Sequence, residues 1–170
     1  MKPRETDLKW HVLYTRPKFE KKICEEIGYL RFENYLPVRT VVRRWSDRMK
    51  KIEEPLFAGY IFVKKGSRQG ADLLQIPGVI RFVSTGGRPD VIADNEIDKI
   101  RLIESEGRDV QKEDYFSVGD PVMIKQGVFA GITGVLVRNV NQQPRFMIRL
   151  PLLKQAISVE VSAEDLMSIN

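Results

Sequence analysis

In the first hundred positions, some segments have the apolar pattern of a strand and others have the apolar spacing of a helix. The segment 10–14 is rich in aromatic and β-branched residues, which is typical of a strand. Apolar residues then recur every three or four positions, at Phe19, Ile23, Ile27 and Leu30. This spacing predicts the apolar face of a helix. Strand patterns return at 35–45, 60–63 and 79–83. A second helix is expected from Asp94, because isoleucines at 97, 100 and 103 repeat at helical spacing.

The last third of the chain has a different pattern. Residues 106–114 are almost entirely polar and predict a linker. Four short strand patterns follow, separated by turns, at 121–125, 134–140, 145–150 and 157–161. We therefore expect an α+β fold, in which an N-terminal antiparallel sheet flanked by helices (8–105) precedes a small C-terminal β-barrel (115–170).

The segment Glu54–Val63 reads Glu-Pro-Leu-Phe-Ala-Gly-Tyr-Ile-Phe-Val and allows two interpretations. Pro55 and Gly59 indicate a bend before a buried strand. In one interpretation this is an ordinary central strand, with Phe57 in the core. In the other, the kink turns Phe57 outward as an exposed aromatic anchor for a partner protein.

Composition narrows the class of protein. Hydrophobic residues make up 42% and charged residues 30% of the chain, and no apolar run is long enough to span a membrane. The N-terminus lacks the apolar segment of a signal peptide. Cys24 is the only cysteine, so an intramolecular disulfide is impossible, which fits the cytoplasm.

The positive charge belongs to the first part of the chain. Residues 1–105 contain 21 Lys and Arg against 15 Asp and Glu, whereas residues 106–170 contain 7 against 8, which together give the net charge of +5. A basic cluster at positions 43–51 sets five cations against Asp47, and it is expected at the tip of a hairpin. Its members Arg43, Arg44 and Arg48 are either simply solvated or, with Trp45 beside them, in contact with a phosphate backbone.

Catalytic and metal-binding patterns are absent from the sequence. His11 is the only histidine and lies in a predicted strand, so a packed or surface ring is expected. No histidine and cysteine spacing matches a metal site, and Gly86-Gly87 lacks the rest of a phosphate-binding loop. Cys24 has no neighbouring base. We therefore expect a protein that is not an enzyme and uses no cofactor or metal.

Four segments, in order, resemble the NusG/RfaH family of transcription elongation and antitermination factors. They are the strand at 10–14 with its following helix, the segment 54–63, the segment 76–83 (Ile-Pro-Gly-Val-Ile-Arg-Phe-Val), and the segment 118–137, which resembles the KOW motif. The resemblance covers residues 8–168. It implies an N-terminal NGN domain, the type found in these factors, and a C-terminal KOW barrel.

The resemblance also implies partners. In this family the N-terminal domain binds the clamp of the largest RNA polymerase subunit through a hydrophobic patch, which suppresses pausing. By position, Tyr14, Leu56 and Phe57 match that patch. Arg16 and Lys18 match basic residues near the exposed non-template DNA strand.

The C-terminal domain of the family recruits a small-ribosomal-subunit protein or the termination factor Rho. The matching positions are Phe129 and Ile132 in one loop and Leu152 and Leu153 on the adjoining strand. The Glu-Pro-Leu-Phe sequence at 54–57 is closer to RfaH-like paralogues that act on chosen operons. We expect a monomer that does not bind membranes.

An alternative function is an RNA-binding or ribosome-associated KOW protein. In that case the barrel and the basic hairpin would bind the RNA or the ribosome. The near-neutral charge of residues 106–170 argues against it, because RNA binding relies on cationic contacts to phosphates.

Overall fold

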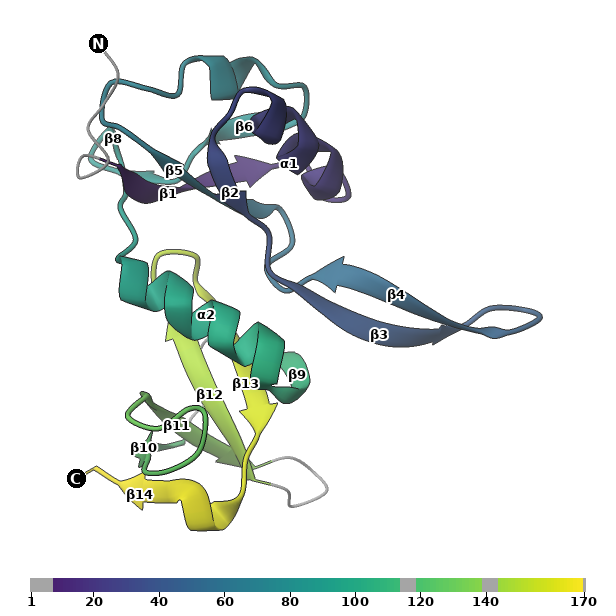
Figure 1. Cartoon of the computed structure of the whole chain (residues 1–170), viewed down its shortest axis with the longest axis vertical. Coiled ribbons are helices and arrows are strands. Elements are labelled where there is room, and N and C mark those ends of the chain that lie inside the picture. Colours follow the sequence, from purple (N-terminus) through teal and green to yellow (C-terminus); the bar gives the residue numbers. More distant parts are fainter. Residues whose placement is uncertain (1–7, 114–118, 139–143, 170) are drawn as a thin grey trace. The chain divides into compact units, whose positions relative to one another are not determined.

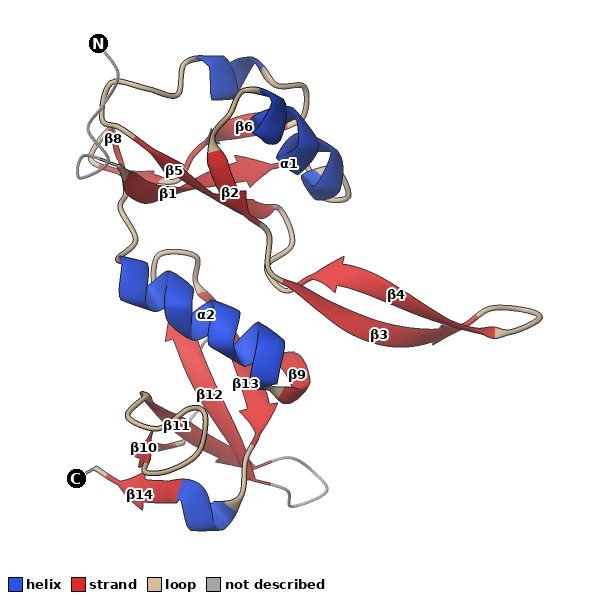
Figure 2. Ribbon diagram, viewed as in Figure 1, coloured by secondary structure: helices blue, strands red, loops and turns tan. Residues whose placement is uncertain are grey.

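The structure is a computed structural model that describes residues 8–113, 119–138 and 144–169. The chain divides into two compact units, Met1–Ile97 and Asp98–Asn170. An antiparallel sheet forms the centre of each unit (Figures 1 and 2). Within the described ranges, none of the helices is both long and apolar enough to cross a membrane.

The sheet of the first unit has four strands in the order β2-β5-β1-β6. The strands are β1 (Lys9–Thr15), β2 (Glu33–Tyr35), β5 (Tyr60–Lys65) and β6 (Val79–Phe82). Every neighbouring pair is antiparallel. The two strands with the longest apolar patterns, β1 and β5, lie at the centre of the sheet, where both of their faces can be covered.

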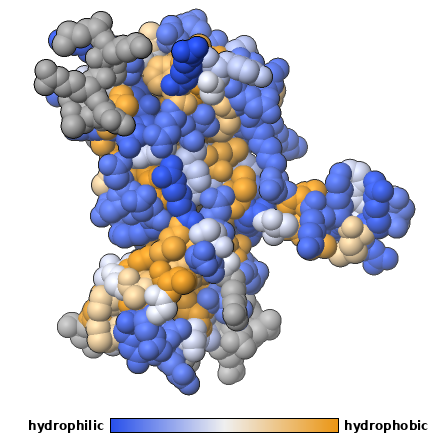
Figure 3. All heavy atoms as spheres, in the orientation of Figure 1, coloured by the Kyte–Doolittle hydropathy of each residue, from blue (hydrophilic) through white to orange (hydrophobic). Residues whose placement is uncertain are grey.

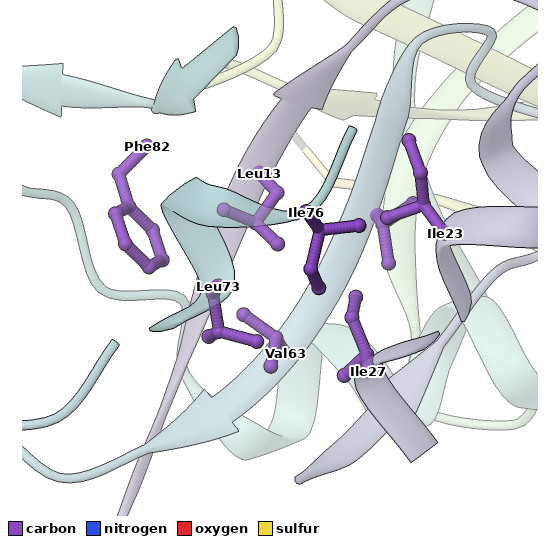
Figure 4. Close-up of a cluster of buried hydrophobic side chains, with 8 residues drawn as sticks. Leu13, Ile23, Ile27, Val63, Leu73, Ile76 and Phe82 are labelled. Atoms are coloured by element: carbon purple, nitrogen blue, oxygen red, sulfur yellow. The ribbon is translucent and has the colours of Figure 1, made fainter. Parts of the chain in front are cut away.

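Helix α1 (Glu20–Tyr29) packs on one face of this sheet. Its Ile23 and Ile27 join Leu13, Ile61 and Val63 of the central strands in a buried cluster, which Leu73, Ile76 and Phe82 complete (Figure 4). The helical spacing correctly predicted Ile23 and Ile27. It was wrong for Phe19 and Leu30, which are 43% and 42% exposed, because they flank the helix rather than lie within it.

A two-stranded hairpin interrupts the chain between β2 and β5. It consists of β3 (Val38–Arg44) and β4 (Met49–Pro55), which pair only with each other. Figure 1 shows it extending away from the four-stranded sheet. The backbone N–H of Trp45 donates to the carbonyl of Arg48 at 2.8 Å and closes the tip. The predicted basic hairpin is confirmed.

The remaining elements of the first unit are short. A 3₁₀ turn, η2 (Asp72–Gln75), precedes β6, and a minimal hairpin joins β7 (Ser84–Thr85) to β8 (Arg88–Pro89). Helix α2 (Asp94–Glu106) then begins at the predicted residue and continues past Ile97, so most of it belongs to the second unit. Its Ile97, Ile100 and Ile103 are buried, as their spacing predicted.

The second unit contains a six-stranded sheet in the order β14-β10-β11-β12-β13-β9. Its elements are β9 (Arg108–Glu113), β10 (Asp120–Ile124), β11 (Thr133–Arg138), β12 (Pro144–Leu150), β13 (Gln155–Glu160), the 3₁₀ turn η3 (Ala163–Asp165) and β14 (Leu166–Ser168). The four predicted strands are present, although residues 139–140 of the second lie outside the described residues, and two strands that were not predicted, β9 and β14, lie at the ends of the sheet order. The predicted α+β fold class, with a C-terminal domain made of strands, is confirmed.

The prediction of a linker at 106–114 is wrong for most of that segment. Residues Arg108–Glu113 form β9, which pairs with β13, while Asp114 lies outside the described residues. The polar sequence of β9 suits a sheet edge. Its acidic residues also contact Arg145, a buried side chain on β12 that is only 3% exposed.

Candidate functional surfaces

The first candidate surface is the face of the four-stranded sheet opposite α1. Side chains alternate along a strand, so Trp10, Val12 and Tyr14 of β1 lie on the face that Leu13 does not occupy. Tyr14 pairs directly with Tyr60 of β5, and their rings lie 5.3 Å apart. The Cζ atom of Arg81 is 5.7 Å from the centre of the Tyr14 ring, a cation–π contact. Tyr14 itself is half-buried.

Leu56 and Phe57 do not form the exposed patch that was considered from the sequence. Both are 0% exposed. The ring of Phe57 meets Phe62 edge-on, with centres 6.1 Å apart, and Phe62 stacks on Tyr35. Phe57 is therefore a packed aromatic residue of the sheet face that carries Tyr14, and the interpretation of Phe57 as an exposed anchor is wrong in this conformation.

The bend after Phe57 explains this position. Gly59 has a φ of +83°, and its N–H donates to the Glu20 carboxylate at 2.8 Å. The carbonyl of Gly59 accepts from the N–H of Thr15 at 2.8 Å. A Cβ at Gly59 would lie 3.2 Å from the Thr15 carbonyl oxygen, so both the φ angle and the space favour glycine. The bend is as predicted, and buried Glu20, which sequence reasoning missed, holds it against the start of α1.

The predicted basic residues lie on two separate elements. Arg16 and Lys18 are exposed on the loop between β1 and α1, where the Arg16 N–H donates to the Gly78 carbonyl at 2.8 Å. Lys18 adopts a φ of +73°. Arg43, Arg44 and Arg48 are exposed on the β3–β4 hairpin.

Ion pairs divide the hairpin into two regions. At its base, the Glu54 carboxylate accepts from Arg39 at 2.6 Å and from Arg43 at 2.9 Å. Toward the tip, none of the ion pairs among the described residues involves Arg44 or Arg48. Arg43 is therefore partly neutralised, whereas Arg44 and Arg48 present their charge to solvent.

The predicted C-terminal contact residues are mostly buried. Phe129 and Ile132 are each 8% exposed, Leu153 is 4% exposed, and Leu152 is half-buried. The large apolar side chain that this loop does expose is Val128, at 59%. Sequence reasoning missed Val128, although its position between Gly127 and Phe129 in a turn was a signal for exposure.

The side chains considered for chemistry are packed. His11 is buried and its Nδ1 lies 2.8 Å from the Asp90 carbonyl oxygen, while burial and the nearby Lys65 lower the pKa of the ring. Burial, with Glu20 and Glu25 nearby, raises the pKa of the Cys24 thiol to about 12, which makes it a poor nucleophile. Across the described parts of the chain, no group of three or more histidine, cysteine or acidic side chains could hold a metal ion.

Three comparisons relate this chain to known proteins. Residues 8–101, more than half of the chain, match the family model for NusG, described as transcription termination factor nusG. Among proteins named transcription termination/antitermination protein NusG, that of Rickettsia bellii is 26% identical over 165 residues, covering 91% of this chain and 86% of the relative. The Pseudomonas aeruginosa protein is 25% identical over 170 residues, covering 90% and 94%.

A solved structure shows the same fold. It is titled "Domain interaction in Thermotoga maritima NusG", with a TM-score of 0.62 and 24% identity over 97% of this chain and 99% of that one. The family match, the relatives over nearly the whole length and this shared fold agree with one another. The chain belongs to the NusG family of transcription termination and antitermination factors.

Proposed function

We propose that this NusG-like transcription factor binds RNA polymerase through its first unit, suppresses pausing and termination, and recruits a partner through its second unit. The observation that carries the proposal is the match of residues 8–101 to the NusG family model. The aromatic sheet face bearing Tyr14 lies within that match and supplies a surface of the required chemistry, because aromatic side chains are enriched among the residues that dominate protein interfaces.

The surface we assign to the polymerase clamp centres on Tyr14 and extends to Leu56 and Phe57. Tyr14 is half-buried, whereas Leu56 and Phe57 are buried, and Phe57 packs against Phe62 on the same face of the sheet. Arg16 follows Tyr14 by two residues and Lys18 by four, and both expose their charge. We assign these two cations to non-template DNA next to the bound polymerase.

In the second unit we assign partner binding to the loop of Phe129 and Ile132 and to Leu152 and Leu153. Exposed Val128 would provide the direct contact, since Phe129 and Ile132 are packed beneath the loop. A ribosomal protein of the small subunit and Rho are the two partners we consider. The Glu54–Phe57 sequence supports a specialised, operon-specific paralogue. We further propose that it acts as a monomer in the cytoplasm.

The test is binding of the full chain to purified core RNA polymerase. We expect co-elution on size exclusion and a loss of affinity of about 30-fold in Tyr14→Ala, the size of an interface hot spot. The control is Tyr29→Ala, which removes a tyrosine of α1 that is 79% exposed. Equal binding by the two variants would contradict the Tyr14 surface, and no co-elution of the unmodified chain would contradict the function.

The alternative is an RNA-binding or ribosome-associated protein that works through its second unit. Residues 106–170 have one more acidic than basic residue, so they offer little attraction to phosphates. Tight, salt-dependent RNA binding by a fragment of residues 107–170 would favour this alternative over the polymerase-bound factor.

A further inference from the structure

The outer half of the β3–β4 hairpin exposes apolar side chains far from any core. Val42 is 55%, Trp45 49% and Met49 63% exposed. The two strands pair only with each other, and a two-stranded ribbon alone is at best marginally stable in water. Figure 3 shows the hairpin as mostly hydrophilic, with hydrophobic residues among the polar ones. Folding of the first unit does not account for an exposed indole at the tip.

The strand register places these side chains on two opposite faces. Residues directly across an antiparallel pair share a face, and the pairs Val42–Lys51 and Arg44–Met49 are two residues apart, so they lie together. Arg43 and Lys50 form the pair between them and point to the other side. The Nζ of Lys50 lies 4.7 Å from the centre of the Trp45 ring, which places the indole on this second face.

Charge is graded along the hairpin. Its acidic residues near the base are already engaged, with Glu54 bound to Arg39 and Arg43, and Glu53 bound to Lys21 of α1 at 3.2 Å. Beyond them, residues 43–51 contain five cations and only Asp47 as an anion. Among the described residues, Arg44, Arg48 and Lys51 take part in no ion pair. The outer half therefore combines unneutralised positive charge with an accessible aromatic ring.

Single-stranded nucleic acid matches this combination. Its phosphates suit the cations, and its unpaired bases can stack on an indole, whereas the bases of a duplex are already stacked on each other. An anionic membrane also attracts cations and tryptophan. However, Val42 and Met49 lie on one face and Trp45 on the other, so these side chains cannot enter one membrane surface together.

We propose that the outer half of the hairpin binds single-stranded nucleic acid that passes around the narrow ribbon, with a base stacked on Trp45 on one face, phosphates bound by Arg44 and Lys51 on the other, and Arg48 at the tip between them. A flexible single strand can follow both faces of the ribbon in this way, whereas a flat membrane surface cannot. The sequence left two interpretations of the hairpin arginines open, solvation or contact with a phosphate backbone; this inference adopts the second and adds the kind of strand and the stacking residue. It is independent of the polymerase surface around Tyr14, which lies on a different element.

The experiment titrates the full chain into a labelled single-stranded oligonucleotide of about 15 nucleotides and into the matching duplex, at several salt concentrations. Fluorescence anisotropy reports binding, and tryptophan fluorescence reports stacking. Trp45 dominates the response because the other tryptophan, Trp10, is 2% exposed. The variants are Trp45→Ala, the double variant Arg44→Gln/Lys51→Gln, and Tyr29→Ala as an exposed-aromatic control.

We expect Trp45→Ala to weaken single-strand binding by at least about fivefold, to leave duplex binding unchanged, and to abolish the fluorescence quenching. The double charge variant should weaken binding to both ligands and make the salt dependence for the single strand shallower by about 0.7 for each phosphate that the variant no longer binds. Tyr29→Ala should bind like the unmodified chain. Unchanged melting temperatures would show that each variant is folded.

Two results would overturn the proposal in distinguishable ways. If Trp45→Ala binds the single strand normally while the charge variant does not, the stacking site is wrong and the basic hairpin survives as a phosphate contact. If neither variant changes binding, or if the unmodified chain binds anionic phosphatidylserine vesicles but no single strand, the nucleic-acid role of the hairpin falls as well. Polymerase co-elution, measured separately, decides the main function in either case.

Discussion

The guanidinium of Arg145 on β12 donates from Nη1 to Oδ2 of Asp109 on β9 at 3.0 Å, and its Nε donates to the Ser158 hydroxyl on β13 at 2.9 Å. Arg145 is 3% exposed. A buried cation requires partners, because burial without them costs several kcal/mol. The strand β9 therefore completes the second unit by supplying the acidic partners of Arg145.

Asp109→Ala should destabilise the second unit. The substitution removes a charge-assisted hydrogen bond from a buried guanidinium, which is worth about 1.5–3 kcal/mol. Glu113, with Oε1 at 3.7 Å from the Arg145 Nε, remains as a partial partner. Urea unfolding of the full chain measures the decrease in stability. A double variant with Arg145→Met should lose less than the sum of the single variants, and strict additivity would contradict the coupling.

The stability of an isolated second unit should depend on whether the fragment begins before or after β9. A fragment of residues 107–170 keeps β9, and we expect it to fold alone with a β-type circular dichroism spectrum. A fragment of residues 115–170 lacks Asp109 and Glu113, and should be less stable by about 3–5 kcal/mol, the cost of leaving a buried charge unpaired. Equal melting temperatures would show that β9 is dispensable, and a predominantly helical spectrum from either fragment would contradict the strand assignment.

Phe57→Ala should lower the stability of the first unit by about 3–5 kcal/mol, because a buried aromatic ring in contact with Phe62 is removed. Thermal unfolding measures the effect, and Phe57→Leu, which keeps an apolar side chain, should lose less. An exposed anchor would behave in the opposite way, with an unchanged melting temperature and weaker polymerase binding. That outcome would support the interpretation of Phe57 as an exposed anchor, which its burial argues against.

His11 should make the stability of the first unit depend on pH. Burial, reinforced by Lys65, lowers its pKa below the ordinary value of 6.5, so the folded state favours the neutral ring. The unfolded chain therefore binds more protons, and stability is lost as the pH falls below about 6.5, by at most about 1.4 kcal/mol per pH unit. Urea unfolding at pH 7.5 and 5.5 checks this against His11→Gln, whose stability should change less between the two values.

Local patterns in the sequence determined much of this protein. Apolar spacing predicted α1 and α2 together with the central strands of both sheets, because a residue's burial in a regular element follows the period of that element. The cluster of cations around Trp45 predicted the basic hairpin. The four family segments identified the NusG-type fold before any spatial information entered.

Tertiary structure decided what no local pattern specifies. The bend at Gly59 places Phe57 against Phe62, and the direction of a side chain after a bend depends on contacts with distant residues such as Glu20. Residues 108–113 have the composition of a linker, yet they form a strand that pairs with β13 and supplies an acidic partner to Arg145, far along the chain. Local composition reports how well a segment is solvated, whereas the partner that a polar residue meets is fixed only when the chain folds.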